Sequence, residues 1–189
     1  MKFEELKLQG AYIVDLQPLY DERGFFAWAY CSQEFQALGM VSKVVQANLS
    51  TNPVKGTLRG LHYQLAPYHP YQETKFVRCI RGSLYDVIID LRPASPTYLE
   101  WVGVALTAYN YRGLFVPRDF AHGFITLEDN TEAFYMVSQF YTPGAESGIR
   151  WNDPMMHIEW PLEPAVISDK DASWPDYQNV LCTICNTVN

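Results

Sequence analysis

Short segments in which apolar and polar residues alternate run along most of the chain, with Gly, Pro, Asn or Asp between them. Alternation with a period of two is typical of β-strands that bury one face, and turn residues mark where such strands end. Lys75–Ile80 and Leu84–Leu91 form the clearest pair, joined near Arg81-Gly82-Ser83. Further strands are predicted over residues 101–106, 113–116, 123–127 and 132–140. Many short strands at even spacing predict an all-β protein: a sandwich, a jelly roll or a small barrel.

Helical periodicity is weak, and its best example is Ser32–Leu38, with Ser32 as the expected N-cap and Gly39 as the expected end. No internal repeat, low-complexity tract or linker interrupts the chain. Its 189 residues, 48% of them hydrophobic, supply one sizeable core. We therefore expect residues 1–189 to form a single domain, in which the segment from Pro161 onward wraps around the β core.

The charge balance limits the partners of the protein. The formal net charge is -7 and the sequence pI is about 5.0, so the chain lacks the basic footprint of proteins that bind nucleic acid or anionic membranes. An anionic ligand would have to be held by local arginines and lysines. Glu4, Glu5 and Lys7 interrupt the apolar residues near the N-terminus, so we expect no secretory signal, no membrane span and a cytoplasmic location.

Cysteines and histidines give little sign of a metal or redox site. The four cysteines are too few and too scattered for a disulfide framework, and we expect reduced thiols. Cys182 and Cys185 form a CxxC near the chain end, but no second pair follows it, so we interpret it as part of the tail. The HxH pattern and downstream glutamate of metal-binding cupin barrels are also missing, and no metal is predicted.

The stretch LRGLHYQ sets Arg59 and His62 three residues apart in an apolar, aromatic segment. On a regular strand these two side chains would face opposite sides, unless Gly60 supplies a bulge between them. His62 and His122 each lie near a glycine in an aromatic setting, which suits the mouth of a barrel. On these residues alone, a histidine buried in the core and a histidine in a site are both open.

Several motifs in order give the chain its clearest resemblance. Its motifs resemble those of the dTDP-4-dehydrorhamnose 3,5-epimerase family from about Asp21 to Asp171; they include QANLS, LRGLHYQ, TKFVRCIRGSLYDV, SPTYLEW, VPRDFAHGF, YTPGAESGIRWNDP and ISDKD. The resemblance implies a cupin-type jelly roll with a few short helices. It also implies a homodimer that works without cofactor or metal on a nucleoside diphosphate 4-keto-6-deoxyhexose in deoxysugar biosynthesis.

The same resemblance assigns catalytic roles. The carbonyl at carbon 4 acidifies the protons at carbons 3 and 5, so inversion needs a base on one face of the sugar and an acid on the other. His62 matches the family's general base and Asp171 the carboxylate that orients it. Lys75 matches the lysine near the keto oxygen, where negative charge grows, and Tyr135 matches the acid. Without the family, Lys75 is typical of a charge on a strand surface and Tyr135 of a cross-strand aromatic.

The expected substrate-binding residues follow in the same way. Arg59 and Arg23 suit the diphosphate, because the guanidinium fork can engage phosphate oxygens in pairs. Tyr141 could stack on the base. The remaining positions that match the family's pocket are Phe26, Gln46, Asn48, His122 and Glu146.

Departures from the family pattern leave the nucleotide and the number of inverted carbons open. Trp28 stands where the family usually has a glutamate, Met136 replaces the lysine that commonly follows the catalytic tyrosine, and Asp119 replaces a glycine. Three alternatives remain. A metal cupin oxygenase needs three converging ligands. A non-catalytic sugar-nucleotide-binding cupin has no need of the four catalytic residues together. A nucleotide-sugar 3,4-ketoisomerase also moves protons beside a carbonyl, so only its product would distinguish it.

Overall fold

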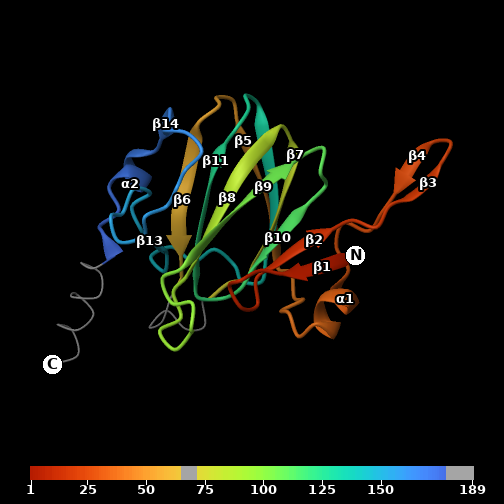
Figure 1. Ribbon diagram of the computed structural model, residues 1–189, viewed down its shortest axis with the longest axis horizontal. Helices are drawn as coiled ribbons and strands as arrows, with labels where there is room; N and C mark the ends of the chain where they lie inside the picture. The colour runs from red at the N-terminus through yellow and green to blue at the C-terminus, as the bar shows by residue number, and fades with distance from the viewer. Residues whose placement is uncertain (65–71, 178–189) are drawn as a thin grey trace.

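Two β-sheets lie face to face and form the body of the protein in the computed structural model (Figure 1), which describes residues 1–64 and 72–177. The first sheet contains, in spatial order, β1 (Lys2–Glu5), β2 (Tyr12–Asp15), β10 (Gly113–Val116), β7 (Lys75–Arg81), β12 (Thr131–Val137) and β5 (Gln46–Asn52). The second contains β13 (Ser147–Gly148), β6 (Thr57–Tyr63), β11 (Phe120–Thr126), β8 (Ser83–Asp90) and β9 (Trp101–Thr107). This architecture confirms the all-β jelly-roll prediction.

The order of the strands brings distant parts of the sequence together. From β5 to β12, each strand lies in the other sheet from its predecessor, except that β8 and β9 form a hairpin within the second sheet. All pairs are antiparallel apart from β14 (Val166–Ile167), which pairs with β6 in parallel. The short helix α2 (Asp169–Ala172) follows β14 and lies beside β6 (Figure 1). Within residues 161–177, β14 and α2 thus pack beside β6 of the second sheet, which agrees with the expectation for this part of the segment.

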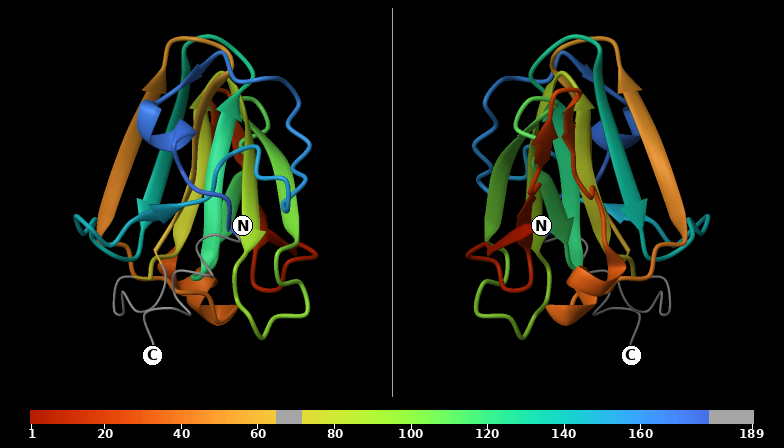
Figure 2. Two further views of the ribbon diagram at one scale, coloured as in Figure 1. Left: turned by 90° about the vertical axis from the view of Figure 1, so that its left-hand side faces the viewer. Right: turned by 90° about the vertical axis from the view of Figure 1, so that its right-hand side faces the viewer.

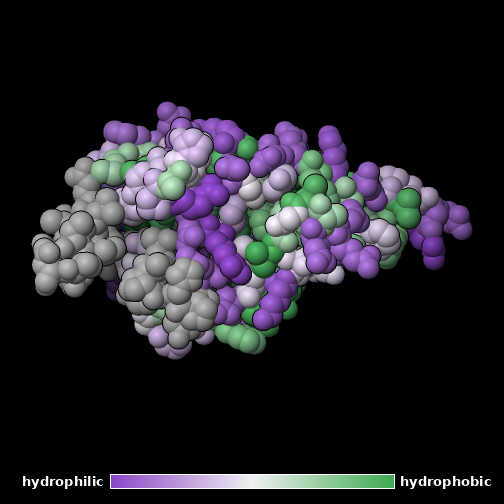
Figure 3. All heavy atoms as spheres, turned by 90° about the horizontal axis from the view of Figure 1, so that it is seen from below, coloured by the Kyte–Doolittle hydropathy of each residue, from purple (hydrophilic) through white to green (hydrophobic). Residues whose placement is uncertain are grey.

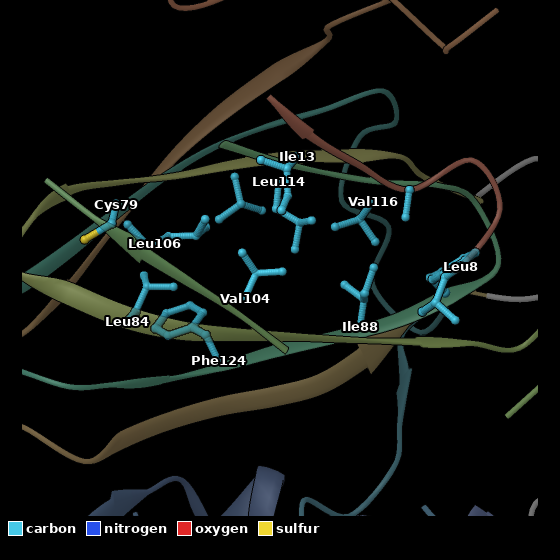
Figure 4. Close-up of a cluster of buried hydrophobic side chains, with 14 residues drawn as sticks. Leu8, Ile13, Cys79, Leu84, Ile88, Val104, Leu106, Leu114, Val116 and Phe124 are labelled. Atoms are coloured by element: carbon cyan, nitrogen blue, oxygen red, sulfur yellow. The ribbon is translucent and has the colours of Figure 1, made fainter. Parts of the chain in front are cut away.

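The inner faces of both sheets meet in one apolar cluster. In Figure 4, Ile13 and Leu114 of the first sheet point toward Val104 and Ile88 of the second. These four side chains are at most 8% exposed. Burying such side chains contributes about 1.5–3 kcal/mol each, so this cluster is a main source of stability for the sandwich. Tyr135 packs against the cluster from β12, which links the core to the site described below.

The helix α1 (Ser32–Ala37) lies at the lower end of the strands in both views of Figure 2. Its buried Phe35 makes edge-on ring contacts with Phe76 and Phe115 of the first sheet. The prediction of Ser32 as N-cap was wrong. The Phe35 N–H donates to the Cys31 carbonyl, so the helix begins one residue earlier, and Cys31 gives no side-chain cap. Its predicted end is confirmed, because Gly39 adopts a φ of 73°.

A hairpin of β3 (Leu19–Asp21) and β4 (Gly24–Phe26) projects from the body (Figure 1) and pairs with no other described strand. Apolar side chains appear among polar ones along this projection in Figure 3. Leu19, Tyr20 and Phe26 are 71%, 76% and 63% exposed. Phe25 contacts Tyr111 of the body edge-on, with ring centroids 5.1 Å apart. The hairpin is therefore anchored at its base while three large apolar side chains remain uncovered.

The predicted strands agree with the structure at their centres and differ at their ends. The strand 113–116 is found as predicted, and Arg81-Gly82-Ser83 joins β7 to β8, with Gly82 at a φ of 70°. The prediction 123–127 began too late, because Phe120 already pairs with Asp90 of β8. The prediction 132–140 ended too late, since β12 stops at Val137, and the Ser138 N–H donates to the Thr74 carbonyl in the next connection.

Two remaining expectations concern membranes and thiols. Within residues 1–64 and 72–177, no helix has the length and apolar character needed to cross a bilayer. Cys31 and Cys79 are free thiols, and burial raises the pKa of Cys79 to about 11, which leaves it protonated at neutral pH. Cys182 and Cys185 lie outside the described residues.

Candidate active site

A cleft opens where β5, β7 and β12 of the first sheet face β6 and β11 of the second. It has two adjoining hollows, of about 280 and 530 Å³, which share the residues His62, Lys75, Tyr135, Tyr141 and Glu146. Pockets for small ligands typically measure about 300–1,000 Å³. All five shared residues carry a charge, an imidazole or a phenol, so the cleft can both bind a polar ligand and transfer protons.

The strand register builds the first wall. Tyr135 of β12 lies opposite Asn48 of β5. Val137, two residues on, lies opposite Gln46 of β5 and Lys75 of β7. Because alternate residues of a strand share a face, all five side chains point into the cleft. The Gln46 amide donates to Asn48 Oδ1 at 2.6 Å, which fixes the orientation of both amides.

A bulge in β6 builds the second wall. His62 lies opposite His122 of β11, whereas Arg59 lies opposite Phe124, so three steps along β6 match two along β11. The extra residue turns His62 to the side of Arg59, and both line the larger hollow. Gly60 makes this possible, because its φ is 126° and an added Cβ would lie 2.5 Å from the Cα of Gly123. The predicted bend at Gly60 is thus present.

His62 and Asp171 form a close pair although 109 residues separate them. His62 Nε2 lies 2.7 Å from Asp171 Oδ1, and the Gly60 N–H donates to Asp171 Oδ2 at 3.1 Å. Asp171 itself is placed by α2, where its N–H donates to the Ser168 Oγ at the helix N-cap. Histidine, carboxylate and backbone amide therefore hold one another in a single orientation.

The protonation of this pair follows from the surroundings of Asp171. Burial raises the pKa of Asp171. The hydrogen bond and charge of His62, the Gly60 N–H and Trp174 lower this pKa by more than burial raises it, so the pKa lies below its ordinary value. Asp171 is therefore an acceptor carboxylate at neutral pH. Nε2 of His62 then carries the proton that Asp171 accepts, and the lone pair lies on Nδ1, as a general base requires.

A second carboxylate faces that free nitrogen. Glu146 Oε1 lies 3.8 Å from His62 Nδ1, which is longer than a hydrogen bond. Glu146 is held from behind by the Lys170 ammonium, and this contact raises the pKa of Lys170. Lys170 also lies over the ring of Trp174, 5.4 Å from its centroid. A negative charge is thus in place to stabilise an imidazolium that forms on His62.

Lys75 stands on the opposite wall, beside Tyr135. Its ammonium lies 3.0 Å from Glu73 Oε1, and the two side chains are only 13% and 15% exposed. His122 lies behind the cleft, with its Nε2 2.7 Å from Asp86 Oδ1, although the ring N–H is not aligned for a hydrogen bond. The wall thus presents a cation and a phenol, while His122 lines only the larger hollow.

Arg59 borders the open part of the cleft. Its Nε donates to the Asn52 amide oxygen at 2.8 Å and its Nη2 lies 3.4 Å from the Thr51 carbonyl. Both partners are neutral, so its charge remains available for an anion. Tyr141 also borders both hollows and is 59% exposed.

Two of the predicted binding residues, Arg23 and Phe26, do not lie at the cleft. Both lie on the β3–β4 hairpin, where Arg23 pairs with Asp21 of the same turn. Neither lines either hollow. The structure assembles the other ten predicted residues around the cleft: His62, Lys75, Tyr135, Asp171, Gln46, Asn48, Arg59, His122, Tyr141 and Glu146.

Among the residues of the site that were not predicted, three have side chains that bear on its charge and polarity. Glu73 and Gln64 line the smaller hollow, and Lys170 supports Glu146. Lys170 stands inside the ISDKD motif, so its place beside Asp171 was a usable signal. Glu73 carried no such signal, because it lies outside the quoted motifs and becomes part of the site only through its contact with Lys75.

A metal site needs several converging side chains that can act as ligands. Within the described part of the chain, no cluster of three or more His, Cys, Asp or Glu side chains could hold a metal ion. The two carboxylates nearest His62 have other partners: Asp171 bonds to His62 Nε2, and Glu146 pairs with Lys170.

The comparison with known protein families agrees with this geometry. The sequence profile of the dTDP-4-dehydrorhamnose 3,5-epimerases matches residues 5–179. The chain belongs to this family. As one of these epimerases it is an isomerase, and its substrate is a nucleotide sugar. The enzyme class predicted from the motifs is confirmed.

Individual epimerases show how far the similarity extends. The dTDP-4-dehydrorhamnose 3,5-epimerase of Shigella flexneri is 47% identical over 152 residues, which cover 80% of this chain and 82% of that protein. The crystal structure of the Bacillus anthracis enzyme with TDP and PPi bound has a TM-score of 0.87 at 40% identity, over 92% of this chain and 98% of that chain. A 3'-monoepimerase from Streptomyces bikiniensis in complex with dTDP-quinovose has a TM-score of 0.82 at 29% identity, over 93% and 89% of the two chains.

Proposed function

We propose that this epimerase inverts carbon 3, carbon 5 or both in a dTDP-linked 4-keto-6-deoxyhexose, through an enolate and without a cofactor. The observation that carries the proposal is the placement of the His62–Asp171 pair on one wall of the cleft, with Lys75 and Tyr135 on the other. Inversion requires that a proton leave from one face of a carbon and return to the other. Two walls with separate proton-transfer groups meet that requirement.

His62 begins the reaction. Its Nδ1 removes the proton next to the keto group, while Asp171 holds the ring by Nε2 and stabilises the imidazolium. Glu146, 3.8 Å from Nδ1, adds a negative charge on the side where the proton arrives. A positioned base of this kind typically contributes about 10²- to 10⁴-fold.

Lys75 and Tyr135 complete the reaction. As the proton leaves, negative charge develops on the keto oxygen, and the Lys75 ammonium stabilises it most in the transition state. Tyr135 then donates its phenolic proton to the opposite face of the carbon. A phenol with an ordinary pKa near 10 suits donation at neutral pH better than abstraction.

The rest of the cleft orients the substrate. The charges of Lys75 and Lys170 are each compensated by a glutamate, whereas the guanidinium of Arg59 has neutral partners among residues 1–64 and 72–177. Arg59 is therefore the group that engages the diphosphate. Tyr141 stacks on the base, and the linked amides of Gln46 and Asn48 bind polar groups of the sugar nucleotide.

The identity of the nucleobase and the number of inverted carbons are supported by different observations. Thymidine is favoured because the similar structures contain TDP or a dTDP-sugar. Because one of these is a 3'-monoepimerase, the proposal covers inversion of one carbon or of two. Trp28 and Met136, the departures from the family pattern, are the positions we propose to influence that number.

A homodimer and a cytoplasmic location are also part of the proposal. The β3–β4 hairpin exposes Leu19, Tyr20 and Phe26, and a second copy of the chain would cover them. It would also explain why Arg23 and Phe26 match family binding positions yet lie away from the cleft of their own chain. In the dimer, the hairpin of one protomer supplies both side chains to its partner.

Exchange of substrate protons with solvent tests the function directly. The protein is incubated in deuterated water with dTDP-, CDP- and GDP-linked 4-keto-6-deoxyhexoses, and NMR follows deuterium at carbons 3 and 5. We expect rapid exchange and inversion with the dTDP sugar. Exchange at neither carbon would overturn the proposal, and a 3-keto product would show a ketoisomerase instead.

The matched variant for this experiment is His62→Ala. It should abolish exchange at both carbons while dTDP binding stays within about threefold of the wild type, since His62 contacts the sugar and not the nucleotide. A sugar-nucleotide-binding module without activity would bind dTDP in both forms and exchange in neither.

A further inference from the structure

The Lys75 ammonium does not stand alone in the cleft wall. Glu73 Oε1 lies 3.0 Å from its Nζ, and both side chains are more than four-fifths buried. Both residues line the smaller hollow, together with Tyr135. A carboxylate at this place is costly to remove from water and acts on the group that stabilises the enolate.

Both sequence neighbours of Glu73 are hydrogen-bonded to other elements, Gln72 by its side chain and Thr74 by its backbone. The Gln72 amide donates to Asp119 Oδ1 at 2.6 Å, just before β11. On the other side, the Thr74 N–H donates to Ser138 Oγ at 2.8 Å, and the Ser138 N–H returns to the Thr74 carbonyl at 3.1 Å. Glu73 is thus held between two anchored residues, and its carboxylate stays beside β7.

Lysine is the side chain that most needs such a partner. Its four-carbon stem has many rotamers, so an unpaired ammonium samples many positions. Catalysis by charge stabilisation requires a donor at a fixed place, and an error of about 1 Å can cost on the order of 10²-fold. A carboxylate that already holds the ammonium removes this disorder before the substrate arrives.

We propose that Glu73 is a positioning residue that holds the Lys75 ammonium toward the keto oxygen of the substrate. The inference rests on the proposed function. Glu73 also neutralises Lys75 in the empty cleft, so this end receives the uncharged sugar while the diphosphate goes to Arg59. Removing the charge of Glu73 therefore creates a second free cation.

Two variants separate the position of Lys75 from the charge of Glu73. Glu73→Gln keeps an oxygen that accepts from the ammonium, whereas Glu73→Ala removes it. For Glu73→Ala we expect kcat for solvent exchange to fall about 30- to 100-fold with KM changed less than threefold. Glu73→Gln should keep most of the wild-type kcat, because its amide oxygen still accepts from the ammonium. It should also bind inorganic pyrophosphate several-fold tighter than the wild type in calorimetry, a change that a structural defect would not produce.

The control and the double variant make the test decisive. Glu132→Gln removes the carboxylate of an ion pair with Arg81 at the other end of β7, outside the cleft, and should leave the rates unchanged. Adding Glu73→Ala to Lys75→Ala should cause no further loss, because Glu73 acts through Lys75. Additive losses, or wild-type kcat in Glu73→Ala, would overturn the inference. Failure of the proposed function differs from both, since the wild type itself would then show no exchange.

Discussion

At the scale of single residues, the environment of each titratable group decides its role. His62 could have been a buried core histidine, and its sequence context does not exclude this. Asp171 on Nε2 and Glu146 facing Nδ1 separate the two ring nitrogens into one that is held and one that can take a proton. His122 has a similar carboxylate neighbour, Asp86, but His122 is only 8% exposed where it lines the larger hollow. The two histidines thus differ in access rather than in partner.

Tyr135→Phe tests whether the two walls of the cleft carry out separate proton transfers. The change keeps the ring that packs on the core and removes only the hydroxyl. His62 can still remove and return a proton on its own face, so exchange at carbon 3 or carbon 5 should persist, while the inverted product forms at least about 10²-fold more slowly. NMR in deuterated water measures both signals. Equal loss of both would indicate a binding role for Tyr135.

At the scale of elements, the bulge in β6 is the feature on which the site depends. Gly60→Ala should destabilise the folded protein for two reasons. Its φ of 126° is unfavourable for a side chain, and its Cβ would meet the backbone of Gly123. Gly39→Ala, after α1, is the control, with a φ of 73° and open space around the added Cβ.

Urea unfolding and the epimerase assay compare these two glycine variants. Both lose roughly 1–2 kcal/mol from the backbone conformation, and Gly60→Ala loses a further 1–3 kcal/mol, approximately, from the close approach of β11. Because the bulge turns His62 toward Arg59, only Gly60→Ala should also lose activity. Equal stability of the two variants would contradict this explanation of Gly60.

The strands show which features of the fold the sequence contains. The sequence pattern located β7, β8, β9 and β10 well, although β8 and β10 are buried on both faces. It could not locate the end of β12 at Val137, where the pairing with β5 and β7 stops although the apolar pattern continues. Ten of the twelve predicted site residues came together through matching motifs. Glu73 did not, because its role depends on a neighbour's side chain.

At the scale of the whole molecule, charge and surface set its stability and assembly. Asp90 is fully buried at the end of β8; burial raises its pKa, but hydrogen bonds from Arg92, Ser95 and Thr97 lower it more, to about 2 from an ordinary 3.8. A carboxyl with a lowered pKa stabilises the folded state above pH 4. That contribution is lost as the pH falls through the folded-state pKa.

Asp90→Asn should therefore remove a stabilisation of roughly 2 kcal/mol at pH 7. The difference in the free energy of unfolding between wild type and variant should shrink between about pH 4 and pH 2, the interval between the two pKa values. Urea titrations at several pH values measure it. A difference that stays constant down to pH 2 would show that Asp90 acts through packing alone.

Substitutions in the β3–β4 hairpin test whether this hairpin holds a dimer together. The double variant Tyr20→Ser, Phe26→Ser removes two large exposed apolar side chains outside the core, so each chain should fold but dimerise less. Analytical ultracentrifugation should show a dimer for the wild type and mainly monomer for the variant. Leu38→Ser, at an exposed apolar residue after α1, is the control. A wild-type monomer that is fully active would contradict the proposed exchange of hairpins.

The pairing of His62 with Asp171 also sets when the enzyme becomes competent as it is made. Every strand of the two sheets except β14 has been synthesised once the ribosome passes Gly148, and the cleft walls then have their histidine, lysine and tyrosine. The carboxylate that orients the histidine comes 23 residues later, on the turn of α2. Under the proposed mechanism, a nascent chain, or one cut before α2, therefore lacks the carboxylate that orients His62 and should be inactive.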